Sequence, residues 1–341
     1  MKKVFAMLVA LSLVVASVTM SVFAADVGSN ETTIDNVSLG QIQDIFVDYL
    51  DEKGLPLEPG TAEYYNYVLE QLLDHSDTDL CDHDNYDLIH AYMVEYKLAY
   101  EDYLLCSSDT APLSADAIAG VNDCIVEDDS SQAIDFVLSE SFLSKTIGDI
   151  IAENQLSSAE SPISRAATLS SYSGEDAAAY AKKYADGNNS TYPHYATGDC
   201  TNFVSQCIYA GGIKMDGSNN KSGTYDSTTD WYCIYINSFL GFRQYAVTTS
   251  WIRVADFNTY MSSLATKSTK TTISSLISAC EVGDPVLLAD KTTGTPYHAI
   301  IISGKDSSTA YYSGHTTSRN NVDVKDHLDQ NSDKFYLFDL T

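Results

Sequence analysis

The sequence predicts an α+β fold, because helical and strand patterns occupy different parts of the chain. Before Val282 apolar residues recur mainly at helical spacing, and after it they form short β-rich runs separated by turn residues. The charge distribution is the third observation. Residues 26–160 carry 30 Asp and Glu against 3 Lys and Arg, whereas residues 161–341 carry 17 against 14. We therefore expect a small acidic all-α domain followed by an α+β domain.

The chain divides into four predicted segments. Residues 1–24 combine two lysines, an apolar run and the small-residue pattern Val22-Phe23-Ala24, which is typical of a secretory signal peptide. An acidic helical domain over 25–155 and a Ser/Ala-rich linker over 156–171 precede the second domain, 172–341. We expect a secreted protein, extracellular or associated with the cell wall. No later segment is long and apolar enough to span a bilayer.

Cap and turn residues predict the helices of the acidic half. Ser38 begins one that ends at the turn 54–56, Thr61 begins a second, and a third follows Asp84-Asn85. Weaker helical patterns cover 134–143 and 147–151. The acidity makes nucleic acid an unfavourable partner, because phosphate binding needs a basic surface, and a solvated surface explains most of these carboxylates.

The second half changes from helices to strands. Ser173 caps a helix, and helical patterns follow at 203–208, 255–261 and 273–280. The runs 285–289, 298–303 and 309–313 predict an antiparallel meander, which 336–338 closes. Trp231 and Trp251 lie between these regions, where large aromatic residues either fill the core or line a substrate cleft.

Cys200 is the candidate nucleophile. Apolar spacing after Gly198 and the stop at Gly211-Gly212 place it in the first turn of a helix, where the helix dipole favours a thiolate. The alternative is a small core residue. The seven cysteines are an odd number, and without a Cys-x-x-Cys pair they predict neither a disulfide framework nor a metal site.

His298 is the candidate base, because it begins a β-rich run and an imidazole can keep a nearby cysteine ionised. If Ser303 pairs with Thr309 across the intervening turn, His298 lies beside His315. His315 could then orient the base as the third catalytic residue. A loop role for His315 stays open, with the alternative orienting residues Asn320, Asn321 and Tyr312.

The run Gly-Asp-Cys-Thr-Asn-Phe-Val-Ser-Gln-Cys at 198–207 resembles the signature of the putative amidase domain family of secreted bacterial proteins. That family is similar to the CHAP and NlpC papain-like cysteine hydrolases. Further matching runs are Ser250-Trp251, Gly283-Asp284-Pro285-Val286, His298-Ala299-Ile300 and the tail 313–320. The resemblance covers roughly residues 173–326 and excludes the acidic half. Pro285 departs from it and suggests an edge or first-strand position.

The resemblance implies a papain-like fold, with the cysteine-bearing helix packed on an antiparallel sheet. It implies Cys200 as nucleophile, His298 as base and His315 in the third role, without a metal or organic cofactor. The cysteine backbone N–H and a side-chain donor would stabilise the oxyanion. Candidate oxyanion or substrate-binding residues are Asn202, Tyr192, His194, Tyr195, Trp231 and Trp251.

These observations favour a cysteine amidase or peptidase acting on cell-wall peptide or another peptide amide. One alternative is a catalytically silent module that binds peptide or cell wall. Another is an amidase that its own acidic N-terminal half keeps inactive, as a propeptide does. The choice of amide bond and the oligomeric state are left open by the sequence.

Overall fold

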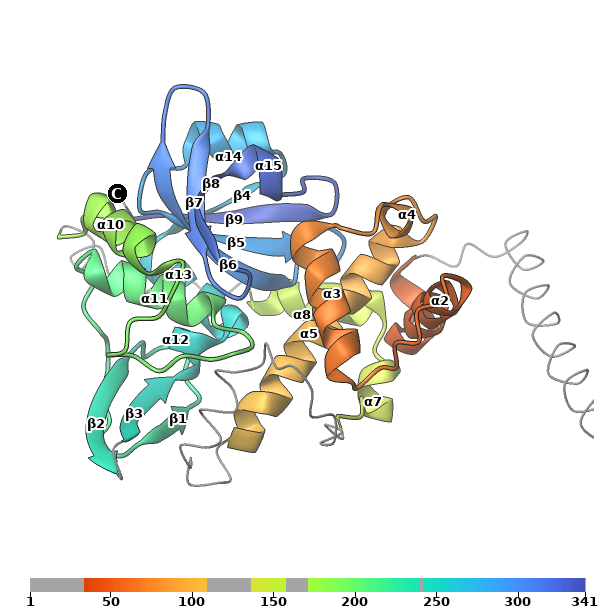
Figure 1. Ribbon diagram of the computed structural model, residues 1–341, viewed down its shortest axis with the longest axis horizontal. Coiled ribbons are helices and arrows are strands. Elements are labelled where there is room, and N and C mark those ends of the chain that lie inside the picture. The colour runs from red at the N-terminus through yellow and green to blue at the C-terminus, as the bar shows by residue number, and fades with distance from the viewer. Residues whose placement is uncertain (1–33, 109–135, 158–170, 240–241, 341) are drawn as a thin grey trace, which may run out of the picture.

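The computed structural model describes residues 34–108, 136–157, 171–239 and 242–340 (Figure 1). The predicted signal peptide and most of the predicted linker lie outside these residues. Within them, helices combine with a three-stranded and a six-stranded sheet, and the larger sheet is wholly antiparallel. The α+β class predicted from the sequence is confirmed.

The regular elements described before residue 158 are helices that begin where the sequence places caps. Ser38 forms a capping box with Gln41, and the side chain of Thr61 accepts from the backbone N–H of Tyr64. The helix predicted over 134–143 is shorter in the described residues, where only its end is helical. The elements are η1 (Ile34–Asn36), α2 (Leu39–Glu52), α3 (Ala62–Asp74), α4 (Thr78–Cys81), α5 (Tyr86–Ser108), α7 (Glu140–Leu143) and α8 (Ile147–Ser157).

The larger sheet has the strand order β4-β9-β5-β6-β7-β8. Its strands are β4 (Thr266–Lys270), β5 (Pro285–Asp290), β6 (Pro296–Lys305), β7 (Ala310–Gly314), β8 (Arg319–Asp323) and β9 (Asp333–Asp339). The predicted meander is β5-β6-β7. Pro285 is the first residue of β5, which is an interior strand and not an edge, so the proline is tolerated through its terminal position.

The smaller sheet was not predicted from the sequence. Its strands β1 (Gly223–Tyr225), β2 (Cys233–Phe239) and β3 (Phe242–Thr248) have the order β1-β3-β2, with β1 parallel to β3. The remaining helices are α10 (Gly174–Tyr184), α11 (Cys200–Ala210), α12 (Thr249–Ile252), α13 (Val254–Leu264), α14 (Ile273–Ala279) and α15 (Val324–His327).

Both faces of the six-stranded sheet are covered (Figure 1). Side chains such as Leu288 and Ile300 share a core with the N-terminal helices, whereas Ala299 and Ile301 pack with α10, α11 and α13. The acidic half is therefore packed against the sheet that carries His298. The domain boundaries inferred from composition stay a prediction.

Buried polar contacts also join the acidic half to the sheet. His90 Nδ1 lies 2.8 Å from Asp290 Oδ2, and Thr295 Oγ1 donates to Glu95 Oε1 at 2.7 Å. Such contacts fix the position of α5 on the sheet, because a buried polar group that loses its hydrogen-bond partner costs about 1–3 kcal/mol.

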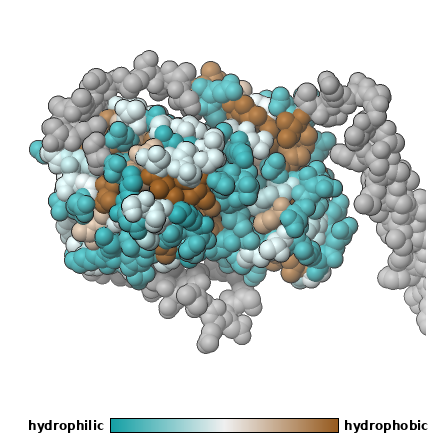
Figure 2. Space-filling view, turned by 90° about the horizontal axis from the view of Figure 1, so that it is seen from above, coloured by the Kyte–Doolittle hydropathy of each residue, from teal (hydrophilic) through white to brown (hydrophobic). Residues whose placement is uncertain are grey.

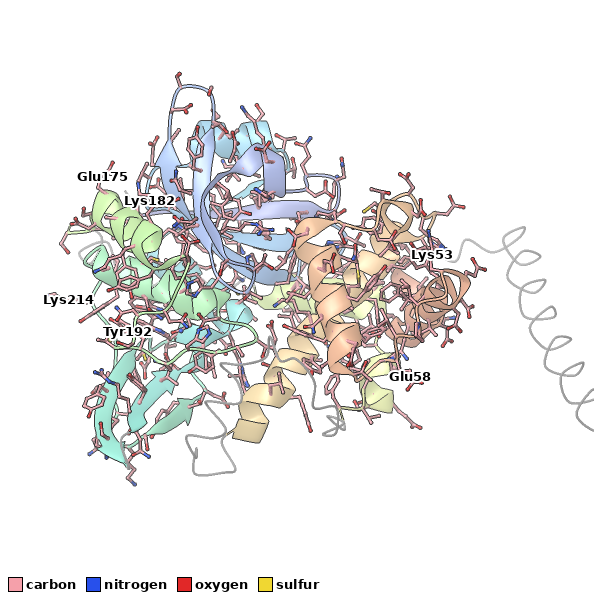
Figure 3. The ribbon with its side chains drawn as sticks, in the orientation of Figure 1. Lys53, Glu58, Glu175, Lys182, Tyr192 and Lys214 are labelled. Carbon is pink, nitrogen blue, oxygen red and sulfur yellow. The ribbon has the colours of Figure 1, made fainter. Side chains whose placement is uncertain are left out.

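The face in Figure 2 is mainly hydrophilic, with separate hydrophobic patches. The charged side chains labelled in Figure 3, among them Lys53 and Glu58 at one end and Glu175 and Lys214 at the other, lie at the periphery. Among the described residues, no helix combines the length and the hydropathy that a membrane span requires.

Candidate active site

Helix α11 presents Cys200 as its first residue. Asp199 precedes it at the N-cap, and its carbonyl accepts from the Phe203 N–H at 2.9 Å. Phe203 and Cys207 lie in the core between this helix and the sheet, which fixes the helix position. Cys200 therefore occupies the first turn, as predicted, although its residue exposure is only 2%.

The Cys200 thiol lies at the backbone N–H of Ala299, the residue after His298, and this N–H favours the thiolate. Thr201 Oγ1 is 3.8 Å from the sulfur. Burial nevertheless dominates and raises the pKa of the Cys200 thiol, against the opposing effect of the Lys97 ammonium. In this conformation burial therefore opposes the thiolate that the helix position alone favours.

His298 lies on β6 opposite Leu288 and is 4% exposed. Its ring borders a narrow pocket together with Leu72 and Tyr312, on the side of the acidic half. Burial lowers the pKa of His298 to about 3, and the positive charges of Lys97 and Arg319 add to this effect. The imidazole is therefore neutral.

The structure brings Cys200 to the strand that carries His298. Among the described residues, no hydrogen bond joins the two side chains, and Nδ1 of His298 is buried without a hydrogen-bond partner. A buried ring nitrogen without a partner is costly, and functional sites are where such atoms are most often retained.

The predicted register of the β6–β7 hairpin is wrong. Lys305 pairs with Ala310, and after a bulge Ile301 pairs with Ser313, so Ser303 does not face Thr309. Asp306 explains the shift, because its carboxylate accepts from the N–H groups of the following loop and closes a tighter turn. By the observed register His298 falls opposite residue 316, which still adjoins His315, but β7 ends at Gly314 and the pairing stops before it reaches either residue.

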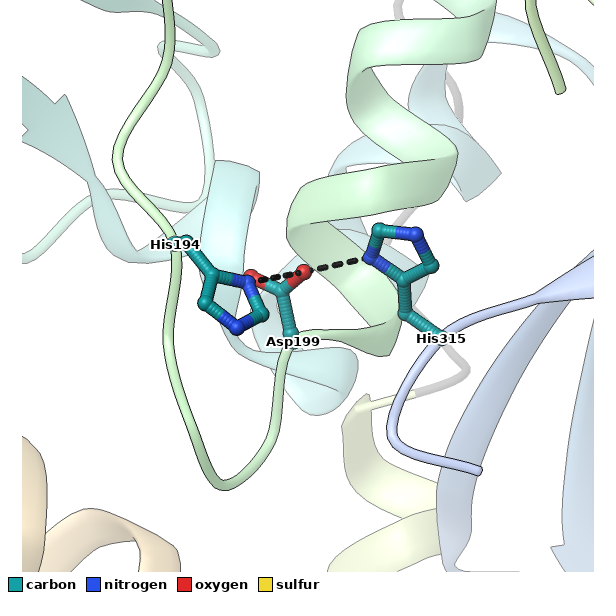
Figure 4. A group of neighbouring side chains, drawn as sticks. All are labelled: His194, Asp199 and His315. Atoms are coloured by element: carbon teal, nitrogen blue, oxygen red, sulfur yellow. Dashed lines mark hydrogen bonds and ion pairs between the residues drawn. The ribbon is translucent and has the colours of Figure 1, made fainter. Parts of the chain in front are cut away.

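His315 instead bonds to the residue that precedes the cysteine (Figure 4). Its Nδ1 lies 2.6 Å from Asp199 Oδ2, and its Nε2 lies 2.9 Å from the Tyr184 carbonyl. Both partners are hydrogen-bond acceptors, so each ring nitrogen faces a protein oxygen and the ring is held on both sides. Desolvation alone would raise the pKa of Asp199, but hydrogen bonds from His194 and His315 lower it overall.

His194 completes this cluster, with Nδ1 3.2 Å from the same Asp199 oxygen. The three ligand atoms lie within 4.8 Å of one another, a spacing that could suit a metal ion. Both His315 nitrogens already lie within hydrogen-bond distance of oxygens of the protein, so both are engaged within the chain. The geometry of the cluster suits holding the loop before Cys200 in place.

The predicted oxyanion and substrate residues have other partners. Both amide hydrogens of Asn202 are engaged, by the Pro193 carbonyl at 2.9 Å and by Asp199 Oδ1 at 2.8 Å, which leaves none for an oxyanion. Tyr195 donates its backbone N–H to the same carboxylate. These residues support the Cys200 loop.

The two tryptophans are core side chains in this conformation, because both are fully buried. Trp231 Nε1 donates to Ser205 Oγ at 3.1 Å, and Trp251 Nε1 donates to Asn202 Oδ1 at 3.0 Å. Tyr192, which Figure 3 labels, stacks on Trp251 with ring centroids 6.2 Å apart. The rings set the position of α11 and form no open cleft wall.

Sequence comparison identifies the segment that contains these residues. A family described as putative amidase domain matches residues 171–338, from the turn before α10 to β9. The match covers just under half of the chain, and we refer to residues 171–338 as the amidase domain. The amidase domain thus includes α11, both sheets and every candidate residue described above.

One curated relative is an uncharacterized protein, YjcM, of Bacillus subtilis (strain 168). It is 29% identical over 165 residues, which cover 46% of this chain and 34% of YjcM, so the chain spans about a third of that protein's length. No solved structure matches.

Two residues outside the amidase domain reach its cysteine, and sequence reasoning missed both. Lys97 and Glu101 lie one turn apart on α5 and form an ion pair of 2.8 Å. Lys97 is completely buried, and its charge acts on both Cys200 and His298. The sequence did contain a signal for Lys97, because residues 26–160 carry only 3 basic residues against 30 acidic ones, and Lys97 is one of the three.

A cavity of about 170 Å³ lies between α5 and the amidase domain. Cys200 and the loop residues before it form one side, α13 residues such as Asp256 form another, and α5 closes it with Leu98, Glu101 and Leu105. The cavity lies next to the Cys200 sulfur, and the acidic half forms part of its wall.

Proposed function

We propose that this protein is a secreted cysteine-dependent amide hydrolase, with Cys200 as nucleophile and His298 as base. The observation that carries the proposal is the position of the cysteine. In an amidase-family domain it is the first residue of α11, with its sulfur at the N–H of the residue after His298. Helix N-termini are where cysteine nucleophiles gain thiolate character.

The reaction consists of two transfers of the acyl group. His298 takes the thiol proton, and the sulfur adds to the amide carbonyl to give a tetrahedral oxyanion. The imidazolium then gives its proton to the leaving amine, the C–N bond breaks and a thioester remains. Water, deprotonated by the same ring, adds to the thioester and releases the acid and the thiol. The N–H groups of the first turn of α11 are candidate oxyanion donors.

Two features must change before this chemistry can occur. The thiol must become accessible and the His298 ring must reach it, because both groups are buried here and not hydrogen-bonded to each other. We propose a papain-like arrangement for the active conformation. His315 contributes by holding Asp199, and so the start of α11, in place.

We propose cell-wall peptide or another peptide amide as the substrate. The support is the amidase family and the predicted signal peptide. The test is to incubate the purified full chain with defined muropeptides and with unrelated peptides, and to identify the products by mass. N-terminal sequencing of protein from the culture medium tests export, with cleavage expected after Ala24.

Cys200→Ala should abolish cleavage, and His298→Ala should reduce it by at least about a hundredfold, the usual scale of a general base. Cys207→Ala is the matched control, because this buried cysteine lies on the same helix without touching the proposed chemistry. Cleavage that survives Cys200→Ala would exclude the cysteine mechanism.

A silent peptide-binding module is the second candidate. The observations that favour it are the burial of Cys200 and His298 and the His298 Nδ1 that has no hydrogen-bond partner. In that case the wild type cleaves none of the peptides, and His298→Ala retains their binding.

A further inference from the structure

We infer that α5 is a cover over the active site, which keeps the amidase domain closed in the intact chain. The α5 cover is the group of side chains Lys97, Leu98, Glu101 and Leu105. The inference rests on the proposed role of Cys200, and it concerns how that residue is controlled by the acidic half.

Glu101 packs against the loop before the cysteine. A Cβ atom placed on Gly198 would lie 3.0 Å from Cδ of Glu101 and 3.2 Å from one of its carboxylate oxygens. Gly198 also has a φ of +72°, which a glycine adopts without strain. The loop therefore approaches the α5 carboxylate so closely that even a Cβ atom at Gly198 would make a contact tighter than ordinary van der Waals packing.

The Glu101 carboxylate is held by two partners from the acidic half. Lys97 Nζ donates to Oε2 at 2.8 Å, and Tyr65 Oη donates to Oε1 at 2.9 Å. The Lys97 and Tyr65 side chains are both essentially fully buried. An ion pair with a second hydrogen bond has one defined geometry, so Glu101 is fixed against the amidase loop.

The cover leaves too little room for a peptide. Ligand pockets usually measure about 300–1,000 Å³. The cavity beside Cys200 is about 170 Å³, and the exposed fraction of the cysteine is 2%. A substrate carbonyl can reach the sulfur only if α5 moves away.

The cover also opposes the chemistry. Catalysis forms an imidazolium on His298, and burial together with the nearby Lys97 ammonium disfavours that charge. Lys97 does favour a thiolate at Cys200, but the loss of water outweighs this effect. Withdrawal of α5 would remove the ammonium and readmit water in one step.

The test measures how fast iodoacetamide labels Cys200 in the full chain, read by mass spectrometry of the peptide that contains it. Glu101→Ala breaks the bonds to Lys97 and Tyr65, and we expect labelling to rise at least about tenfold, the scale of one charge-assisted hydrogen bond. Asp87→Ala is the matched control, because this exposed carboxylate lies in the first turn of the same helix. It should label at the wild-type rate.

Leu105→Ala provides a second variant, since it trims the cavity wall without removing a charge. Urea unfolding of each variant shows that the chain remains folded. Equal labelling of wild type, Glu101→Ala and Leu105→Ala would overturn the cover.

Peptide cleavage separates this inference from the proposed function. Faster labelling together with faster peptide cleavage supports both the α5 cover and the proposed hydrolase. Faster labelling of a chain that cleaves no peptide supports the cover and contradicts the hydrolase. Lys97→Met tests the opposite role for α5. If it slows both labelling and cleavage, Lys97 is part of the catalytic centre and α5 is not a cover.

Discussion

Replacement of Asp199 tests whether its ion pair with His315 holds the cysteine helix in place. The carboxylate accepts from the Tyr195 N–H at 3.0 Å, from Asn202 Nδ2 at 2.8 Å and from His315 Nδ1 at 2.6 Å. Asp199→Ala leaves these three donors, and His194 Nδ1 at 3.2 Å, without this partner at a site that is almost fully buried. Breaking a buried charge pair typically costs about 3–5 kcal/mol, and we expect a loss of that size in the free energy of unfolding.

Asp199→Asn should cost less, about 1–2 kcal/mol. Its amide oxygen can keep the bonds from Tyr195 and Asn202, and its amide N–H₂ can donate to His315 Nδ1 once that nitrogen has lost its proton. The bond from Nε2 to the Tyr184 carbonyl survives in that tautomer. The loss is then the difference between charge-assisted and neutral hydrogen bonds.

Urea unfolding of both variants measures the two costs, with Asp176→Asn as a control at an exposed carboxylate of α10. Equal losses for Asp199→Ala and Asp199→Asn would refute the reasoning, because the hydrogen-bond geometry would then be irrelevant. A loss below about 1 kcal/mol for Asp199→Ala would show that the pair does not hold α11.

Two further predictions concern stability. Gly211→Ala should cost about 1–3 kcal/mol in thermal or urea unfolding, because its Cβ would lie 2.4 Å from Tyr172, whereas Gly187→Ala meets no atom within 4 Å and should be neutral. Burial raises the pKa of Asp333 from 3.8 to about 8. Burial alone lowers the pKa of His90, but its hydrogen bond to Asp290 and the nearby Asp333 charge raise it overall. Both groups bind protons more tightly when folded, so the free energy of unfolding should fall as pH rises toward about 8, and Asp333→Asn should flatten that fall.

Local patterns predicted the elements that carry the candidate nucleophile and base. The capped helices at Ser38, Thr61 and Ser173 depend on neighbouring residues only, and each begins where its cap indicates. The same holds for the start of α11 at Cys200 and for the meander that contains His298. The smaller sheet was missed because its strands include polar and aromatic residues without clear alternation.

The partners of the candidate residues were harder to predict. The hairpin register depends on how Asp306 caps its loop, and β7 ends at Gly314, before the pairing reaches His315. Asn202 has the residue type of an oxyanion donor, but Pro193 and Asp199 take its hydrogens. Residue type defines what a side chain can bind, and neighbours in space define what it does bind.

By itself, the sequence determined a cysteine at a helix start, a histidine on a following strand, and an acidic helical half ahead of both. Only the tertiary structure decided that α5 places Lys97 and Glu101 against the cysteine loop, and that His315 pairs with Asp199. The physical reason is distance along the chain. Lys97 and Cys200, like Asp199 and His315, are separated by about a hundred residues, and no local propensity encodes a contact that exists only after both faces of the sheet are packed.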